Sequence, residues 1–177
     1  MLAFSAYIVK RAIAEQQAQA TATQLRRATD SAAAIGHQLD GVSSSLRAMA
    51  QAESARQGDM AATYAMAARI VEADPRIVGI SLVDVSGHQP FNTLRPFGTP
   101  LPRPPPLLME MQRPIIEQGQ RVVSPLVVGE VSRQQVVGVG MPLAMGPAGR
   151  HALRAVIRLE AIGGWLNEQA WPEDWTA

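Results

Sequence analysis

The stretch from residue 5 to residue 56 contains no proline and is dominated by Ala, Gln, Arg and Ser. Such a sequence predicts one long helix, because it is rich in helix formers and has no strong helix breaker. Within it, apolar residues recur at alternating spacings of three and four, which is typical of a helix that packs along one narrow stripe. This seam consists of Leu25, Ala28, Ala32, Ile35, Leu39, Val42, Leu46 and Met49.

Two partners for this seam are compatible with the pattern. The seam can pack on the next elements of its own chain, or it can pair with the same seam of a second copy in a parallel homodimer. Both arrangements can hold in part.

The rest of the chain predicts a small α+β domain. Asp59 is a good N-cap for a helix over residues 60–73, and Asp74-Pro75 ends that helix because a residue before proline avoids helical dihedral angles. Hydrophobic patterning and turn signals predict five strands, a short helix kinked or restarted at Pro114, and a final helix. The strands span residues 77–83, 88–93, 121–128, 134–145 and 151–159, and the two helices span residues 107–118 and 160–169.

Short connections between the last three strands favour antiparallel pairing. The predicted fold is therefore a PAS-like five-stranded antiparallel sheet with helices on one side, preceded by the long N-terminal helix. The expected division is a helix over residues 1–57 and a sheet domain over residues 58–177. The proline-rich segment 94–106 is expected to be an ordered surface loop.

Composition excludes several classes of function. Sixteen basic residues against fifteen acidic ones leave a net charge of +1, which excludes the strong positive footprint of a nucleic-acid-binding protein. The absence of cysteine excludes disulfides and thiolate chemistry. His37, His88 and His151 lack the paired spacing of a metal site. We therefore predict no catalytic residue, no metal and no cofactor.

The first nine residues, MLAFSAYIV, are mostly apolar and precede Lys10 and Arg11. A membrane-spanning helix needs about 20 apolar residues, so this segment does not span a bilayer by itself. It is interpreted either as the first turns of a soluble helix or as the end of a transmembrane helix.

Several motifs occur in a characteristic order in the second half of the chain. The run 79–87 (GISLVDVSG) ends in an Asp-x-x-Gly turn, and the run 91–102 (FNTLRPFGTPLP) follows it. The segments GQRVVSPL (119–126), VVGVGMPL (136–143) and WPEDW (171–175) come later. Together these motifs resemble the Cache-type (PAS-like, double Cache) extracytoplasmic sensor domains of bacterial sensor histidine kinases and related membrane receptors, over residues 69–175.

The resemblance implies a module that lies outside the cytoplasm and is tethered to the inner membrane. In that family a small ligand binds between the sheet and the helical insert, and the long helix carries the signal to a cytoplasmic kinase, cyclase or chemotaxis region. The chain would be the sensing part alone, or the distal half of a double Cache unit. The alternatives are a dimerisation and signal-relay module without ligand, and the sensor part of a diguanylate cyclase or chemoreceptor.

The candidate ligand site lies where the second strand enters the proline-rich loop. Arg95 can pair with a ligand carboxylate, while Asn92 and Thr93 supply neutral hydrogen bonds; alternatively, Arg95 is a solvated loop residue. Strand residues expected to line the same pocket are Ser81, Ser124 and Met141. Few aromatics are present and Glu130 falls in a turn, so an amino-acid ligand is disfavoured, while a carboxylate, a mostly apolar ligand or no ligand stays open.

Overall fold

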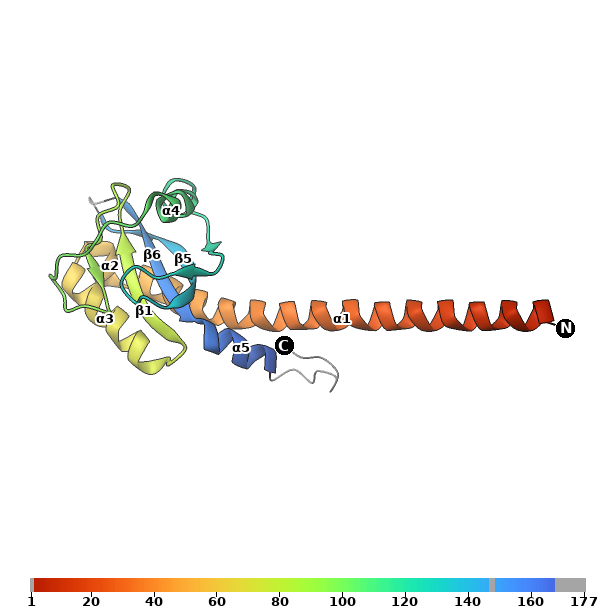
Figure 1. Cartoon of the computed structure of the whole chain (residues 1–177). Helices are drawn as coiled ribbons and strands as arrows, with labels where there is room; N and C mark the ends of the chain where they lie inside the picture. The colour runs from red at the N-terminus through yellow and green to blue at the C-terminus, as the bar shows by residue number, and fades with distance from the viewer. Residues whose placement is uncertain (1, 147–148, 168–177) are drawn as a thin grey trace.

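A computed structural model describes residues 2–146 and 149–167 of the chain. A long N-terminal helix leads into an α+β domain built on an antiparallel sheet, which confirms the predicted fold class (Figure 1). The helices are α1 (Leu2–Gln51), α2 (Glu53–Gln57), α3 (Met60–Ala73), α4 (Pro106–Gln118) and α5 (Leu159–Asn167). The strands are β1 (Ile77–Val83), β2 (Phe91–Asn92), β3 (Val122–Val123), β4 (Val127–Val128), β5 (Gln135–Ala144) and β6 (Arg150–Arg158).

The sheet has the strand order β2-β1-β6-β5-β3, and β4 also pairs with β5. The strand predicted over residues 121–128 is interrupted between β3 and β4. Here the Ser124 hydroxyl accepts a hydrogen bond from the Gly138 N–H at 2.8 Å, and Pro125 has no N–H to donate to a ladder. The remaining strands lie where the sequence predicts them, with β2 shorter than expected.

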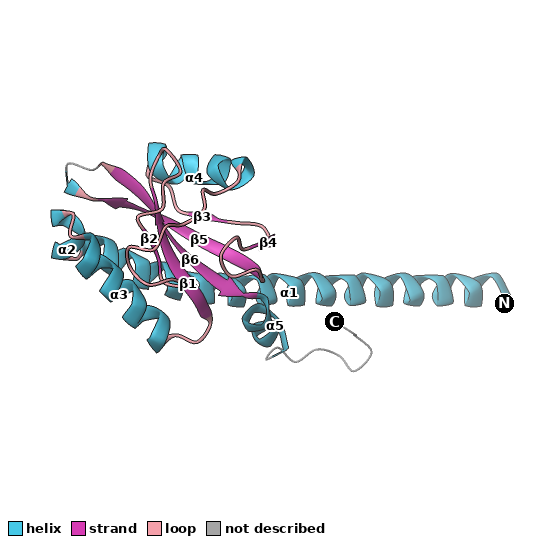
Figure 2. Ribbon diagram, turned by 60° about the vertical axis from the view of Figure 1, so that its left-hand side comes forward, coloured by secondary structure: helices cyan, strands magenta, loops and turns pink. Residues whose placement is uncertain are grey.

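Helices cover both faces of the sheet, so the predicted placement on one side is wrong. The C-terminal part of α1 and helix α3 lie on one face, and α4 lies on the other (Figure 2). The guanidinium of Arg150 on β6 holds the end of α4, because its Nη1 donates to the carbonyls of Ile116 at 3.0 Å and Glu117 at 3.1 Å. Helix α4 runs through Pro114 without restarting.

Local sequence signals account for the helix boundaries on the α1 side. The backbone of Ala52 is extended and separates α1 from α2, which together occupy the segment predicted as one helix. Gly58 has a left-handed backbone (φ 79°) and ends α2. The side chain of Asp59 then accepts the Ala62 N–H at 2.9 Å and caps α3, which spans the predicted residues.

The seam of α1 divides into two parts. Val42, Leu46 and Met49 are buried in the core, and Ile35 and Leu39 pack against it. Leu25 is 69% exposed, and Ala28 and Ala32 are exposed as well. The C-terminal part of the seam therefore packs on its own chain, while the N-terminal part runs away from the domain (Figure 1). The domain boundary at residue 57 stays a prediction, and residues before it contribute to the core.

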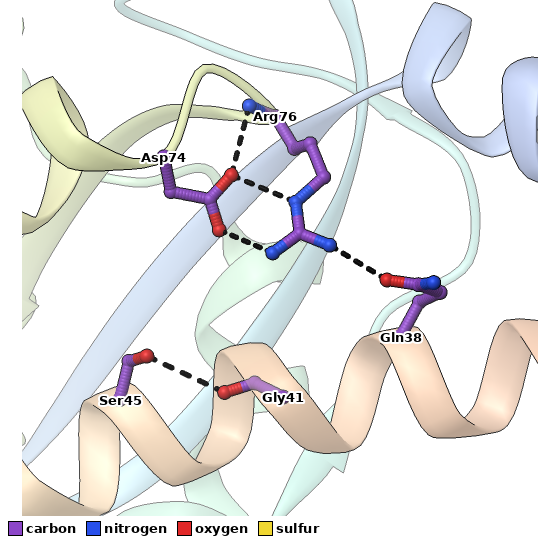
Figure 3. Close-up of polar contacts among 5 residues, drawn as sticks. All are labelled: Gln38, Gly41, Ser45, Asp74 and Arg76. Atoms are coloured by element: carbon purple, nitrogen blue, oxygen red, sulfur yellow. Dashed lines mark hydrogen bonds and ion pairs between the residues drawn. The ribbon is translucent and has the colours of Figure 1, made fainter.

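Arg76, just before β1, forms an ion pair with Asp74 and a hydrogen bond to α1. Arg76 donates from Nε and Nη2 to the Asp74 carboxylate at 2.8 and 2.7 Å, and from Nη1 to the side-chain oxygen of Gln38 at 2.6 Å (Figure 3). The same guanidinium lies 6.0 Å from the centroid of the Trp165 ring on α5. Arg76 thus joins α1, α5 and the sheet at one point.

The Asp-x-x-Gly motif after β1 forms a turn held by its own side chain. Asp84 Oδ1 accepts hydrogen bonds from the N–H groups of Ser86 at 2.8 Å and His88 at 3.0 Å. Burial would raise the pKa of Asp84, but a hydrogen bond from the Ser86 hydroxyl at 2.7 Å and the two backbone hydrogen bonds outweigh it and lower the pKa. The motif 171–175 that contributes to the family resemblance lies outside the described residues.

Candidate functional site

A cavity of ≈ 60 Å³ lies between the sheet and α4, on the face opposite α1. Strands β1, β5 and β6 form its floor, α4 forms one wall, and the segments around β2, β3 and β4 complete the rim. This is the position where the family resemblance implies a ligand. The lining includes Leu94, Leu108, Met111, Ile115, Val127 and Val156 and is therefore largely apolar.

Glycines on alternate strand positions make room for the cavity. Gly138 and Gly140 on β5 and Gly79 on β1 all line it, and none adds a side chain to the floor. Gly140 also permits the close approach of α4, because a Cβ at this position would collide with Cδ1 of Ile115. The glycines therefore leave the floor without side chains at these positions, and they let α4 pack close to β5.

Arg154 lies at the centre of this floor. It pairs with Ser81 on β1 and with Gly140 on β5, so small residues flank it on both neighbouring strands. Its Nε is buried without a hydrogen-bond partner in the protein, and no described carboxylate lies within 4.0 Å of its guanidinium. Burial lowers the pKa of Arg154, and the field of the Glu130 carboxylate opposes that shift.

Two buried amides border the same cavity. Gln112 on α4 is 1% exposed, and neither its side-chain oxygen nor its nitrogen has a hydrogen-bond partner in the protein. Gln89 donates from Nε2 to the Pro102 carbonyl at 2.6 Å. Its Oε1 has no hydrogen-bond partner in the protein. The cavity therefore presents hydrogen-bonding atoms that the fold itself does not use.

Glu130 supplies the second charged side chain of the lining, from the turn between β4 and β5. Its Oε1 is buried and has no protein partner. Burial raises the pKa of Glu130, while Arg154 and Arg133 oppose the shift. A turn position, which the sequence interpretation treated as remote from the ligand, thus brings a carboxyl group to the cavity wall.

Three of the six residues predicted for the ligand site lie on the cavity: Ser81, Asn92 and Ser124. Asn92 is buried, and its Oδ1 accepts the Leu94 N–H at 3.1 Å. Ser124 orients the β3–β4 break by hydrogen bonds to Gly138, as described above.

The other three predicted residues lie outside the cavity lining. Arg95 is exposed, and its carbonyl accepts the Tyr64 hydroxyl of α3 at 3.0 Å, which fixes the loop toward α3. The Thr93 hydroxyl oxygen accepts the Ile80 N–H at 2.9 Å and so serves the sheet. Met141 faces the α1 side, because its position on β5 alternates with Gly140 and places it in the main core.

The sequence interpretation did not select Arg154, Gln112, Gln89 or Glu130. Arg154 carries a readable signal, since it is a charged residue inside the apolar strand pattern Ala-Leu-Arg-Ala-Val-Ile. Gln112 carries another, because it lies four residues after Leu108 and three before Ile115 on the buried side of α4. Gln89 and Glu130 lie in irregular segments, where sequence periodicity says nothing about direction.

The histidines lie apart from this cavity. His37 and His88 are exposed, while His151 is buried with Nδ1 3.3 Å from the Gly149 carbonyl oxygen. Within residues 2–146 and 149–167, no three His, Asp or Glu side chains come together as a metal site.

Comparison with solved structures places the fold among sensory domains. The sensory domain of the Campylobacter jejuni chemoreceptor Tlp3 (CcmL), crystallised with isoleucine bound, superposes with a TM-score of 0.60 at 10% sequence identity, over 79% of this chain and 60% of that one. The ligand-binding domain of the same receptor with 4-methylisoleucine gives a TM-score of 0.60 and 10% identity, over 79% and 59% of the two chains. The chain thus spans about 60% of the Tlp3 domain.

The extracellular domain of rpHK1S-Z16, assigned as a histidine kinase, has a TM-score of 0.47 at 11% identity, over 60% of this chain and 44% of that one, and this weaker likeness supports no conclusion. No protein-family model matches the sequence, and no curated protein is significantly similar to it. The predicted resemblance to a sensor domain is confirmed as a likeness of fold.

Among the described residues, no helix has a stretch that is both long enough and apolar enough to cross a membrane.

Proposed function

We propose that the chain is the small-molecule-sensing module of a bacterial signalling receptor, and that its ligand binds in the cavity between the sheet and α4. The observation that carries the proposal is the set of buried hydrogen-bonding atoms without protein partners around this cavity, on Arg154, Gln112, Gln89 and Glu130. A buried polar group without a partner costs about 1–3 kcal/mol. Four such side chains gathered at one cavity are best explained by a polar ligand that completes them.

The wider setting is proposed from the family resemblance. The module lies in the periplasm or outside the cell, is tethered to the inner membrane, and belongs to a receptor of the sensor histidine kinase type, with a cyclase or a chemoreceptor as the alternative output. It acts by binding and not by catalysis. The binding of isoleucine by the Tlp3 sensory domain supports a small organic ligand for the same fold.

A thermal-shift screen of carboxylates, amino acids, amines and sugars, followed by calorimetric titration of each hit, tests this proposal. Gln112→Leu removes both polar atoms and keeps the side-chain volume, so it should abolish binding of the hit. The matched control is Gln118→Leu at the exposed end of α4, which should bind as the natural protein does. A hit whose affinity is the same in both variants would place the ligand elsewhere and overturn the proposed site.

A second role is favoured by the division of the α1 seam. Leu25, Ala28 and Ala32 continue the apolar stripe beyond the domain, where no described part of the chain covers them. We propose that this part pairs with the same segment of a second copy and relays the signal along α1. A relay by dimerisation without any ligand is the alternative function.

Sedimentation equilibrium of the wild type and two double variants tests the dimer. Leu25→Asp with Ala32→Asp places charges on the seam and should give a monomer. Thr23→Asp with Ala33→Asp adds the same charge at exposed positions off the seam and should leave the dimer intact. A wild-type chain that stays monomeric at high concentration would refute pairing through this segment.

A further inference from the structure

We propose that the ligand is a small carboxylate of no more than about five non-hydrogen atoms and without an ammonium group, whose carboxylate pairs with the guanidinium of Arg154. This inference rests on the proposed function and specifies the chemistry of the same cavity. Four observations support it: the positive charge at the floor, the kinds of side chain found on the described wall, the amide atoms without protein partners, and the size of the space.

The charge at the floor selects an anion. Arg154 is always a donor and never an acceptor, and its buried Nε lacks a protein partner. Ser81 and Gly140, its neighbours across the strands, leave the guanidinium open toward the cavity. A carboxylate is the planar anion that matches the guanidinium fork with two parallel hydrogen bonds.

The wall argues against an ammonium group on the ligand. In a largely apolar cavity such a group is held best by ionised or aromatic neighbours, and no described aromatic side chain lines the cavity. Glu130 carries the one carboxyl among the described lining residues, and it lies in the field of the cations Arg154 and Arg133. The remaining polar wall groups are amides and hydroxyls, which suit a ligand hydroxyl because it both donates and accepts a hydrogen bond.

The amides explain how the ligand is oriented. Gln112 offers its side-chain N–H donors and its oxygen as acceptor, and Gln89 offers its oxygen as acceptor while its nitrogen donates to the Pro102 carbonyl. They lie on α4 and on the segment before β2, whereas Arg154 lies on the floor. A carboxylate on Arg154 can therefore direct its other end toward these side chains.

The space limits the ligand to a few atoms. An apolar cavity of about 150 Å³ holds a benzene ring, whereas the cavity here measures ≈ 60 Å³. Its largely apolar lining suits a short hydrocarbon part.

Binding of an anion should also change the protonation of Glu130. The charged groups that act on Glu130 are Arg154 on β6 and Arg133 in its own turn, and the cavity-lining side chains of β1, β2 and α4 are uncharged. A bound carboxylate neutralises the field of Arg154 and excludes water, so both effects favour the protonated form of Glu130. Affinity should therefore rise as the pH falls toward the pKa of Glu130, as long as the ligand itself stays ionised.

Calorimetric titration with a matched series tests the inference. Propionate, glycolate and glycine have the same number of non-hydrogen atoms and differ only in a methyl, a hydroxyl or an ammonium group; propylamine lacks the carboxylate. We expect propionate or glycolate to bind, with glycine and propylamine at least about tenfold weaker. Arg154→Met should weaken binding by about 30-fold or more, whereas Arg158→Met, exposed on the same strand, should leave it unchanged.

The variant Glu130→Gln distinguishes a simple carboxylate ligand from a zwitterionic amino acid. For a carboxylate ligand the variant keeps its affinity at low pH and loses the pH dependence, which in the natural protein reaches at most about tenfold per pH unit. If glycine or isoleucine binds more tightly than propionate and glycolate, and Glu130→Gln abolishes that binding, the ligand is a zwitterion. The carboxylate inference then fails while the proposed sensing function stands.

Two other results also overturn the inference. If Arg154→Met is folded by circular dichroism and still binds propionate with natural affinity, Arg154 is not the carboxylate site. If no member of the series binds, the ligand class is wrong, and the broad screen with Gln112→Leu decides separately whether the cavity is a sensing site.

Discussion

The two faces of the central sheet are built from the same strands but differ in what they give to the protein. Toward α1 and α3, alternate positions carry large, fully buried side chains such as Leu82, Leu153 and Ile157. Toward α4, the positions between them carry Ser81, Arg154 and Gly140, and the face contains a cavity. The face toward α1 therefore stabilises the fold by close apolar packing, whereas the face toward α4 is less closely packed and carries polar groups around a cavity.

The largest expected effect comes from truncating the packed face. Leu153→Ala should cost about 2–5 kcal/mol of unfolding free energy, because it deletes fully buried methyl groups and leaves a cavity. Val156→Ala on the same strand, which borders the existing cavity, should cost about 1 kcal/mol or less. Urea denaturation of both variants measures the difference. Equal losses would show that the α4 face is packed as well as the α1 face.

The next effect tests how closely α4 approaches the floor. Gly140→Ala should cost about 1–3 kcal/mol, because the new Cβ collides with Cδ1 of Ile115. Ile115→Val removes this Cδ1 atom, so the double variant should recover part of the loss although Ile115→Val alone is destabilising. Thermal denaturation of the two single variants and the double variant gives the coupling energy. If the losses of stability in the two single variants simply add up in the double variant, the contact between residues 140 and 115 does not limit how closely α4 packs.

A smaller effect of opposite sign comes from removing a polar group from the cavity face. Gln112→Leu should stabilise the ligand-free protein by about 1 kcal/mol, because it removes two buried atoms without protein partners. Gln118→Leu, exposed on the same helix, is the control and should leave the stability nearly unchanged. A loss of stability in Gln112→Leu would show that the free fold already satisfies this amide.

Sequence patterning predicts the packed face well and the cavity face poorly, for a physical reason. Burial of apolar residues imposes a period, and this period predicted α3 with its Asp59 cap, β1, β5 and β6. It also predicted the α1 seam, although the division at Ile35 depends on how far the sheet extends beneath the helix.

A binding face is marked by departures from this period. Arg154 and Gln112 are such departures and carry readable signals, whereas Arg95 lies in a loop whose backbone is held toward α3 by the Tyr64 hydroxyl. Glu130 reaches the wall through the conformation of a turn, which local sequence does not determine.

The smallest effect concerns the edge of the packed face, where Arg76 joins α1 and α5 to the sheet. The hydrogen-bonded Arg76 guanidinium lowers the pKa of Asp74 from its ordinary value of 3.8. A carboxyl whose pKa is lower in the folded state stabilises the fold above its unfolded pKa, and this contribution disappears as the pH falls through the folded pKa. Because the pair is partly exposed and screened by solvent, Asp74→Asn should cost at most about 1 kcal/mol at pH 7.

This cost should shrink as the pH falls from 3.8 and should vanish only below the lower pKa of the folded state, where the natural side chain is neutral as well. Urea denaturation of wild type and variant at pH 7 and at pH 3 measures it. Ligand affinity at pH 7 should be the same in both proteins, because Asp74 lies on the α1 side and outside the cavity lining. A variant that keeps its stability but loses ligand affinity would show that the two faces of the sheet are coupled through Arg76 and are not independent.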